Sequence, residues 1–155
     1  MKGLVRQSGF GRVNSIGIVR DAEANAVGAF QSVRTALANN GLPVPTAPLQ
    51  VAAVGPRQAV ALILPGDGAP GMLESLCLQS VAGDPAMPCV DAYFSCLEAR
   101  LPVEQRPRVV DKARFQAFLA SRREKALWIH AAVQQGYLDL RSAPFVDARA
   151  LVTML

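Results

Sequence analysis

The sequence predicts an α/β fold, in which a small sheet of about three strands precedes a largely helical C-terminal half. Three observations predict it. A β-branched apolar run passes directly into a stretch with helical spacing, and two short apolar runs separated by a Gly-Pro turn come next. The rest of the chain shows apolar positions in helical order. Because 51% of the 155 residues are hydrophobic and 18% are charged, the chain has enough apolar side chains for its own core.

The first predicted elements are a strand and a helix. The strand is expected over residues 13–19, behind a short amphipathic segment at residues 3–10, and it contains three β-branched side chains: Ile16, Ile18 and Val19. The helix is expected over residues 24–39, because apolar residues recur there at steps of three and four: Val27, Phe30, Val33 and Leu37. The sequence Asn39-Asn40-Gly41 ends this helix, and a proline-rich loop follows.

A β-hairpin is predicted next. It pairs residues 49–54 with residues 59–64 through Gly55-Pro56-Arg57, with the first run as an antiparallel edge strand. A glycine-rich turn, PGDGAPG, follows, and a helix is expected to begin near Pro70. Further helices are predicted over four ranges: residues 88–101, 110–121, 126–135 and 142–155. We expect residues 1–155 to form one domain, with a sheet part at about 1–82 and a helical part at about 83–155.

Composition excludes several function classes. The longest nearly uncharged run contains glycines and prolines, so no membrane span is predicted, and no apolar signal-peptide segment follows Lys2 and Arg6. The three cysteines have no CxxC spacing, which favours reduced, buried thiols in a cytoplasmic protein. Because His130 is the one histidine and no plausible nucleophile accompanies it, we expect no Ser-His or Cys-His triad.

Positive charge is concentrated in residues 100–125, where eight basic and three acidic residues give +5, against +4 for the whole chain. A basic segment of this kind is typical of contacts with a phosphate backbone. The alternative is a solvated helix face with its flanking loops, because aromatic residues that would stack on bases are almost absent. The candidate nucleic-acid contacts are five arginines: Arg106, Arg108, Arg114, Arg122 and Arg123.

Acidic residues follow two of the predicted strands. Asp21 and Glu23 come after the first strand, and because residues i and i+2 of a strand point to one side, their carboxylates are expected to aim together. Asp67 follows the 59–64 run, and Glu74 lies in or near the first turn of the next helix. If the two strands are parallel neighbours, all four carboxylates gather at the carboxyl ends of the sheet. Acids that repel one another are stabilised by a hard cation, so the pattern predicts an Mg²⁺ site, with Mn²⁺ as a substitute.

Two of these acids also have a purely structural explanation. Glu74 is favourable near a helix N-terminus through the helix dipole, and Asp21 is a candidate cap for the following helix. Spacing alone leaves these explanations open.

Two segments resemble an uncharacterised family of prokaryotic proteins with a Toprim-like domain: "SIGIVRDAEANAVGAFQSVRTAL" and "LILPGDGAPGMLESLCL". In that family a hydrophobic strand ends in Asp-x-Asp, and a later strand ends in Pro-Asp-Asn with Pro-Gly-Met-Leu-Glu behind it. The similarity extends through "DPAMPCVDAYFSCL" and "FQAFLASR" to "QQGYLDL", which covers nearly the whole chain. By this resemblance, Asp21 and Glu23 match the Asp-x-Asp pair, and Glu74 matches the glutamate of the second motif.

The resemblance implies a Rossmann-like, Toprim-like sheet, related in pattern to overcoming-lysogenization-defect nucleases, whose acidic residues hold Mg²⁺ for phosphoryl transfer. The sequence departs from the pattern at three places. Glu23 replaces an aspartate, Gly66-Asp67 replaces Asp-Asn, and no acid precedes Asp21, where Toprim domains carry a glutamate that acts as general acid or base. We therefore expect a Toprim-like domain without its N-terminal unit, which binds a divalent metal and is catalytically degenerate or dependent on a partner. Its catalytic residues are not assigned.

Other functions stay open at this point. One is an Mg²⁺-dependent nuclease, or another phosphoryl-transfer enzyme acting on nucleic acid, that is complete only with a partner or a second copy. Another is a nucleotide binder using the PGDGAPG turn, which ranks last because the turn lacks the P-loop lysine and the GxGxxG spacing. We also expect a homodimer, because without the N-terminal unit residues 13–19 present an open edge or an apolar face. The opposing expectation is that residues 1–12 fold back and cover it.

Overall fold

A computed structural model describes residues 2–124, 126 and 128–155, and it is a mixed α/β structure as expected. The chain forms two compact units. The sheet unit comprises Met1–Met72 and Val146–Leu155, and the helical unit comprises Leu73–Phe145.

The sheet unit holds three strands: β1 (Ser15–Asp21), β2 (Ala52–Val54) and β3 (Arg57–Leu64). Their order is β1-β3-β2, with β1 and β3 parallel and β2 an antiparallel edge strand. The hairpin is confirmed, and the parallel pairing of β1 with β3 meets the condition that the sequence argument had left open. The central strand β3 is buried from Ala59 to Leu64, as its continuous apolar run predicts for a strand covered on both faces.

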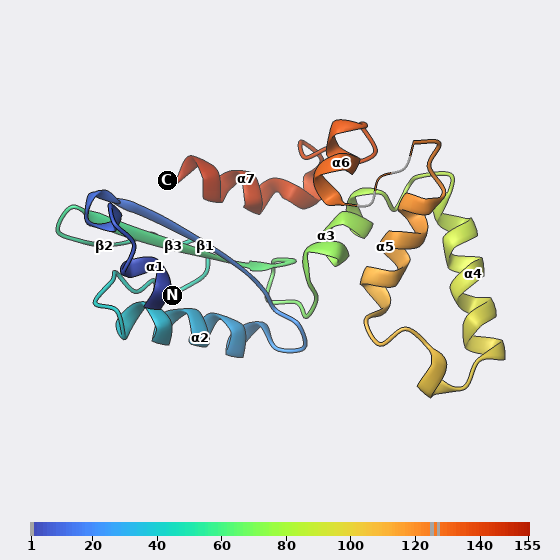
Figure 1. The fold of residues 1–155 in the computed structure, drawn as a ribbon, viewed down its shortest axis with the longest axis horizontal. Coiled ribbons are helices and arrows are strands. Elements are labelled where there is room, and N and C mark those ends of the chain that lie inside the picture. The colour runs from blue at the N-terminus through green and yellow to red at the C-terminus, as the bar shows by residue number, and fades with distance from the viewer. Residues whose placement is uncertain (1, 125, 127) are drawn as a thin grey trace. The chain divides into compact units, whose positions relative to one another are not determined.

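Helix α2 (Ala26–Ala38) covers one face of this sheet (Figure 1). Its inward side chains Ala29, Val33 and Leu37 share a hydrophobic cluster with alternate residues of β1 and β3, such as Ile16 and Ala61. The helix begins after Asn25, whose Oδ1 accepts a 2.8 Å hydrogen bond from the Gly28 amide. Asn25, rather than Asp21, is therefore the cap of this helix.

Helix α7 (Val146–Thr153) lies on the opposite face of the sheet (Figure 1). The chain end fixes this helix to the strands: Gln58 Nε2 donates a 3.1 Å hydrogen bond to the Met154 carbonyl, and the Leu155 side chain lies over Gly17. A Cβ added at Gly17 would stand 2.7 Å from Leu155 Cδ1, so glycine at this strand position allows the close approach. The C-terminal residues thus belong to the sheet unit and complete its second face.

The N-terminal residues form α1 (Lys2–Val5) and a short 3₁₀ turn, η1 (Phe10–Arg12). Val5 and Phe10 pack against the hydrophobic cluster beneath α2, and the Arg57 guanidinium lies 5.5 Å from the Phe10 ring centroid. The N-terminal segment therefore folds back on the α2 side of the sheet, which was the alternative to an uncovered apolar face.

The helical unit contains α3 (Leu73–Ser80), α4 (Met87–Arg100), α5 (Val110–Ala120) and α6 (Ile129–Gln134), with the 3₁₀ turns η2 (Val103–Gln105) and η3 (Ala143–Phe145). Helix α5 contacts both α3 and α4, and its fully buried Phe115 and Phe118 rings stack at 6.1 Å. The three-residue spacing of these two aromatics marks a core face, as the sequence indicated.

The exposure of the cysteines and the length of the helices bear on two further features of the sequence. Cys77 is buried, but Cys89 and Cys96 are exposed, so the prediction of buried thiols is correct for one cysteine and wrong for two, because α4 turns both toward solvent. Among the described residues, no helix has the length and apolar character needed to cross a membrane.

Candidate functional site

Asp21 is the last residue of β1, and Glu23 lies in the loop between β1 and α2. The β1–β3 ladder pairs Asp21 with Leu64 and continues one step further, because the Ala22 amide donates a 2.8 Å hydrogen bond to the Leu64 carbonyl. Both acids line one open hollow of about 340 Å³ beside the start of α2. Arg20, which lines the same hollow, donates a 2.7 Å hydrogen bond from Nη1 to Ser32 Oγ on α2.

The backbone at Glu23 departs from the extended geometry expected for it. Its φ of 52° lies in the left-handed region, which side chains other than glycine and asparagine rarely adopt. Two hydrogen bonds hold it there: the Glu23 amide donates to the Gly71 carbonyl at 2.8 Å, and the Gly71 amide donates to the Glu23 carbonyl at 2.7 Å. These bonds join the loop that follows β3 to the loop that follows β1. Asp21 and Glu23 line the same hollow because of this loop contact, and not because strand geometry continues to Glu23.

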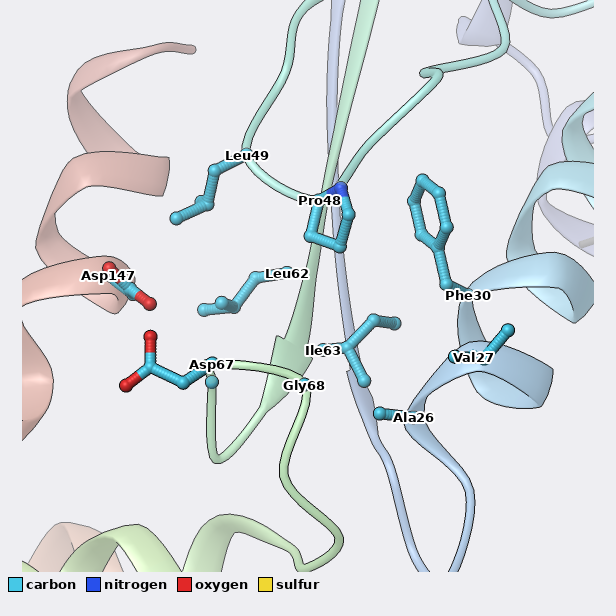
Figure 2. Close-up of a pocket in the computed structure, with 11 residues that line it drawn as sticks. Ala26, Val27, Phe30, Pro48, Leu49, Leu62, Ile63, Asp67, Gly68 and Asp147 are labelled. Atoms are coloured by element: carbon cyan, nitrogen blue, oxygen red, sulfur yellow. The ribbon is translucent and has the colours of Figure 1, made fainter.

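Asp67 lies in the loop after β3, also with a left-handed backbone, at φ 51°. It lines a second pocket of about 340 Å³, together with Asp147 from the first turn of α7 (Figure 2). The structure therefore groups Asp67 with Asp147 in one pocket and Asp21 with Glu23 in another. Of the three described non-glycine residues with positive φ, two are these candidate acids, Glu23 and Asp67.

Glu74 belongs to the helical unit, in the first turn of α3, as the sequence predicted. Its carboxylate acts on Cys77 one turn along: burial, and secondarily the Glu74 charge, raises the pKa of the Cys77 thiol to about 12. Cys77 therefore stays protonated at neutral pH and is a packing residue rather than a nucleophile.

The described residues contain no group of three or more histidine, cysteine, aspartate or glutamate side chains placed to hold a metal ion. Beside the start of α2, Asp21 and Glu23 give the sheet unit one pair of carboxylate residues at the rim of an open hollow. Two carboxylates fit a hard cation that keeps several water molecules, as Mg²⁺ does, and they do not form a closed oxygen cage of the kind that Ca²⁺ prefers.

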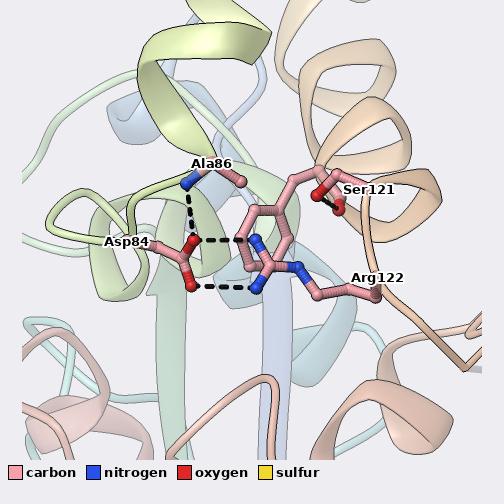
Figure 3. Close-up of polar contacts among 5 residues, drawn as sticks. Asp84, Ala86, Ser121 and Arg122 are labelled. Carbon is pink, nitrogen blue, oxygen red and sulfur yellow. Dashed lines mark hydrogen bonds and ion pairs between the residues drawn. The ribbon is translucent and has the colours of Figure 1, made fainter.

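Three of the five candidate arginines make contacts within the helical unit. Arg122 donates to both carboxylate oxygens of Asp84, at 2.7 and 3.1 Å (Figure 3), and its guanidinium lies 4.2 Å from the Phe118 ring centroid. Arg114 forms an ion pair with Asp91 on α4. Arg106 donates to the carbonyls of Leu101 at 2.9 Å and Glu98 at 2.7 Å.

Arg108 and Arg123 are exposed, and the Arg123 side chain approaches Glu124 at 3.9 Å. Lys125, the last residue of the basic segment, lies outside the described residues. Nucleic-acid contact by this segment stays a prediction, and Arg108 and Arg123 are the two candidate arginines best placed to make it.

Comparison with known protein families gives one family match. Residues 3–151 match the model of a family described as "Protein of unknown function (DUF3226)". The chain belongs to this family. No curated protein and no solved structure matches it. The match covers residues of both units of this DUF3226 chain, and the family description names no activity.

Asp147 is the pocket residue that sequence reasoning missed. It lies eighty residues after Asp67 in the sequence, in a helix that was predicted correctly but without a chemical role. No local pattern reports such a pairing, because it depends on α7 returning to the sheet unit.

Proposed function

We propose that this protein is a Toprim-like module that binds a divalent cation, Mg²⁺ in the cell, through Asp21 and Glu23, and that it depends on a partner for any chemistry on phosphate. The observation that carries the proposal is the parallel pairing of β1 with β3. Parallel strands bring their carboxyl ends to one edge, which is the usual ligand crevice of open α/β sheets. Asp21 is the last residue of β1 at this edge, and Glu23 follows two residues later.

The backbone at Glu23 supports the same proposal. A left-handed glutamate costs on the order of 1 kcal/mol, and such strain persists where surrounding structure maintains it, often at functional sites. Here the paired hydrogen bonds to Gly71 maintain it, at 2.7 and 2.8 Å. They fix the backbone of Glu23 at the hollow that Asp21 also lines, and the local strain is consistent with a residue whose position matters for binding.

A bound Mg²⁺ would neutralise charge on a phosphate group and polarise its oxygens. Phosphoryl transfer also needs a group that moves a proton to or from the reacting oxygens. Among the described residues, no third acid or histidine joins Asp21 and Glu23 in a cluster that could hold a metal. We therefore assign to this chain cation binding and the positioning of a phosphate, and we assign proton transfer to a partner.

Calorimetry with Mn²⁺ tests the proposal on the full chain. We expect weak, millimolar binding that is lost in Asp21→Ala and in Glu23→Ala, since each substitution leaves a single carboxylate. Glu104→Ala, which removes an exposed acid of η2, is the matched control and should bind as the native chain does. Binding that survives both substitutions, or none at millimolar Mn²⁺, contradicts the proposal.

The dependence on a partner has its own measurement. The isolated chain should not cleave plasmid or single-stranded DNA in the presence of Mg²⁺ or Mn²⁺. Cleavage that disappears in Glu23→Ala would instead identify a complete metal-dependent nuclease.

A further inference from the structure

The second pocket of the sheet unit combines an apolar interior with two facing carboxylates. Leu62 and Ile63 are consecutive residues of β3, and their buried side chains point to opposite faces of the sheet. Leu62 lies on the side of Asp67, and Ile63 lies on the side of α2, where Val27 and Phe30 form one wall (Figure 2). Asp67 and Asp147 lie on the opposite side with their carboxylates directed toward one another. The volume of about 340 Å³ falls at the small end of the range for ligand pockets.

The position of the Asp147 carboxylate is defined by the loop after β3. A Cβ built at Gly66, whose φ is 121°, would stand 3.1 Å from Asp147 Oδ2, so the carboxylate lies directly against the glycine backbone. Gly66 is required here both for its backbone angle and for this close approach. Among the described residues, neither Asp67 nor Asp147 takes part in an ion pair. Two like charges held face to face favour a cation between them.

The edge of β3 adds polar backbone groups to the same pocket. Even-numbered residues of β3 bond to β1, since the Gln58 amide donates to Asn14 and the Leu64 carbonyl accepts from Ala22. Odd-numbered residues therefore face the other side, where the Ala61 carbonyl accepts from the Leu49 amide at 2.8 Å. Ile63 is the next residue on that side. An edge of one residue is too short to pair with a peptide strand. The backbone N–H and C=O of Ile63 nevertheless offer one donor and one acceptor to a small ligand.

We infer that this pocket binds a small organic cation, in which an ammonium or guanidinium group is carried on an aromatic or branched aliphatic body. The cationic group lies between Asp67 and Asp147 beside Leu62, and the apolar body passes over the edge of β3 to Ile63 and the α2 wall. A bare metal ion would leave the apolar side chains unused, and a neutral apolar molecule would leave the two carboxylates unpaired. This site is separate from the Asp21–Glu23 hollow and does not rest on the cation binding proposed there.

Phenethylamine is a suitable probe, with 2-phenylethanol as its uncharged counterpart. In an NMR titration of the full chain, we expect phenethylamine to shift the amide signals of Val27, Phe30, Leu62 and Ile63, and 2-phenylethanol to bind about tenfold more weakly, the equivalent of one charge-assisted hydrogen bond. Asp67→Asn and Asp147→Asn keep the side-chain shape, and each should weaken phenethylamine by a similar factor. Asp21→Asn is the control for the other hollow and should leave the affinity unchanged.

A second variant keeps the test decisive if either asparagine substitution impairs folding. Val27 is 79% exposed, so Val27→Lys should fold normally and should weaken phenethylamine binding by placing a positive charge at the α2 wall. Equal binding of amine and alcohol, or shifts confined to other surfaces, would overturn the inference. So would binding of Mn²⁺ at Asp67 and Asp147 in the absence of any phenethylamine binding, since that would define an inorganic cation site.

Discussion

Arg122 shows how a single basic residue is used inside the helical unit. Its guanidinium bonds both oxygens of Asp84, and Asp84 Oδ1 also accepts a 2.8 Å hydrogen bond from the Ala86 amide at the start of α4. The side chains are 18% and 25% exposed, so the pair is only partly solvated. The Arg122 hydrogen bond, followed by that from Ala86, lowers the pKa of the Asp84 carboxyl below its ordinary value of 3.8.

Replacement of Arg122 should therefore have a stability cost that depends on pH. We expect Arg122→Ala to lower the free energy of unfolding by about 1–3 kcal/mol at pH 7, from the lost charge-assisted hydrogen bonds and the lost packing on Phe118. Since the folded-state pKa of Asp84 is lowered, the pair stabilises the protein above pH 3.8 and loses this effect as the pH falls through the folded-state pKa. Urea titrations at pH 7 and pH 3 should thus show the difference from the native chain narrowing in acid.

Arg123→Ala is the matched control, because Arg123 is the next residue in the chain and its side chain is 96% exposed. Its unfolding free energy should stay within about 0.5 kcal/mol of the native value. If Arg122→Ala also stays within that range at pH 7, the ion pair with Asp84 does not support the fold.

At the scale of elements, α7 has a double role: it covers one face of the sheet and it supplies Asp147. Leu151 is the buried residue of this helix, at 5% exposed, whereas its neighbour Val152 is 70% exposed. We expect Leu151→Ala to lower the free energy of unfolding by about 2–4 kcal/mol and Val152→Ala to change it by less than about 0.5 kcal/mol. Thermal or urea unfolding measures both, and equal effects would mean that α7 does not pack on β3.

The basic segment of the helical unit supports a narrower prediction than the sequence did. Arg106, Arg114 and Arg122 are engaged internally, so contact with a phosphate backbone is expected from Arg108 and Arg123. Fluorescence anisotropy with single-stranded DNA should show weak binding that falls steeply as salt rises, and an Arg108→Ala, Arg123→Ala double variant should reduce the salt slope by about 2. No binding at low salt would leave the segment as a solvated face.

The elements that were predicted accurately are those whose signals are local. The Gly55-Pro56 turn indicated the hairpin, and the apolar runs indicated two strands, which pair in parallel in the structure. Helix α3 begins at Leu73 rather than near Pro70, because Gly71 is bonded to Glu23 and the preceding loop cannot enter a helix. The pairing of Asp67 with Asp147 could not be predicted, since it joins two distant segments through the tertiary fold. No sequence pattern around Glu23 indicates its left-handed backbone conformation, because hydrogen bonds to the distant Gly71 hold it.

At the scale of the whole molecule, the outer edge of β1 bears on assembly. Even-numbered residues of β1 bond to β3, so the backbone groups of Gly17 and Val19 face away from the sheet. Val19 is 53% exposed, and the N-terminal residues Val5 and Phe10 pack on the α2 face rather than beyond this edge. An unpaired apolar strand edge favours association with an identical edge about a two-fold axis.

We therefore predict a dimer in sedimentation velocity at high protein concentration. Val19→Lys should dissociate it, because like charges would meet across the shared edge. Val54→Lys places the same charge on the exposed β2 edge and is the control that should remain dimeric. A native chain that sediments as a monomer at high concentration would refute the prediction.

A crystal soaked in Mn²⁺ would reveal directly whether Asp21 and Glu23 hold a divalent cation where β1 ends. We predict an anomalous-density peak at coordination distance, about 2.1 Å, from carboxylate oxygens of both residues, with the remaining positions taken by water. The peak should be absent from Asp21→Ala crystals soaked in the same way. A soaked native crystal without density at these two carboxylates, or with density at Asp67 and Asp147 alone, would show that Asp21 and Glu23 do not form the cation site.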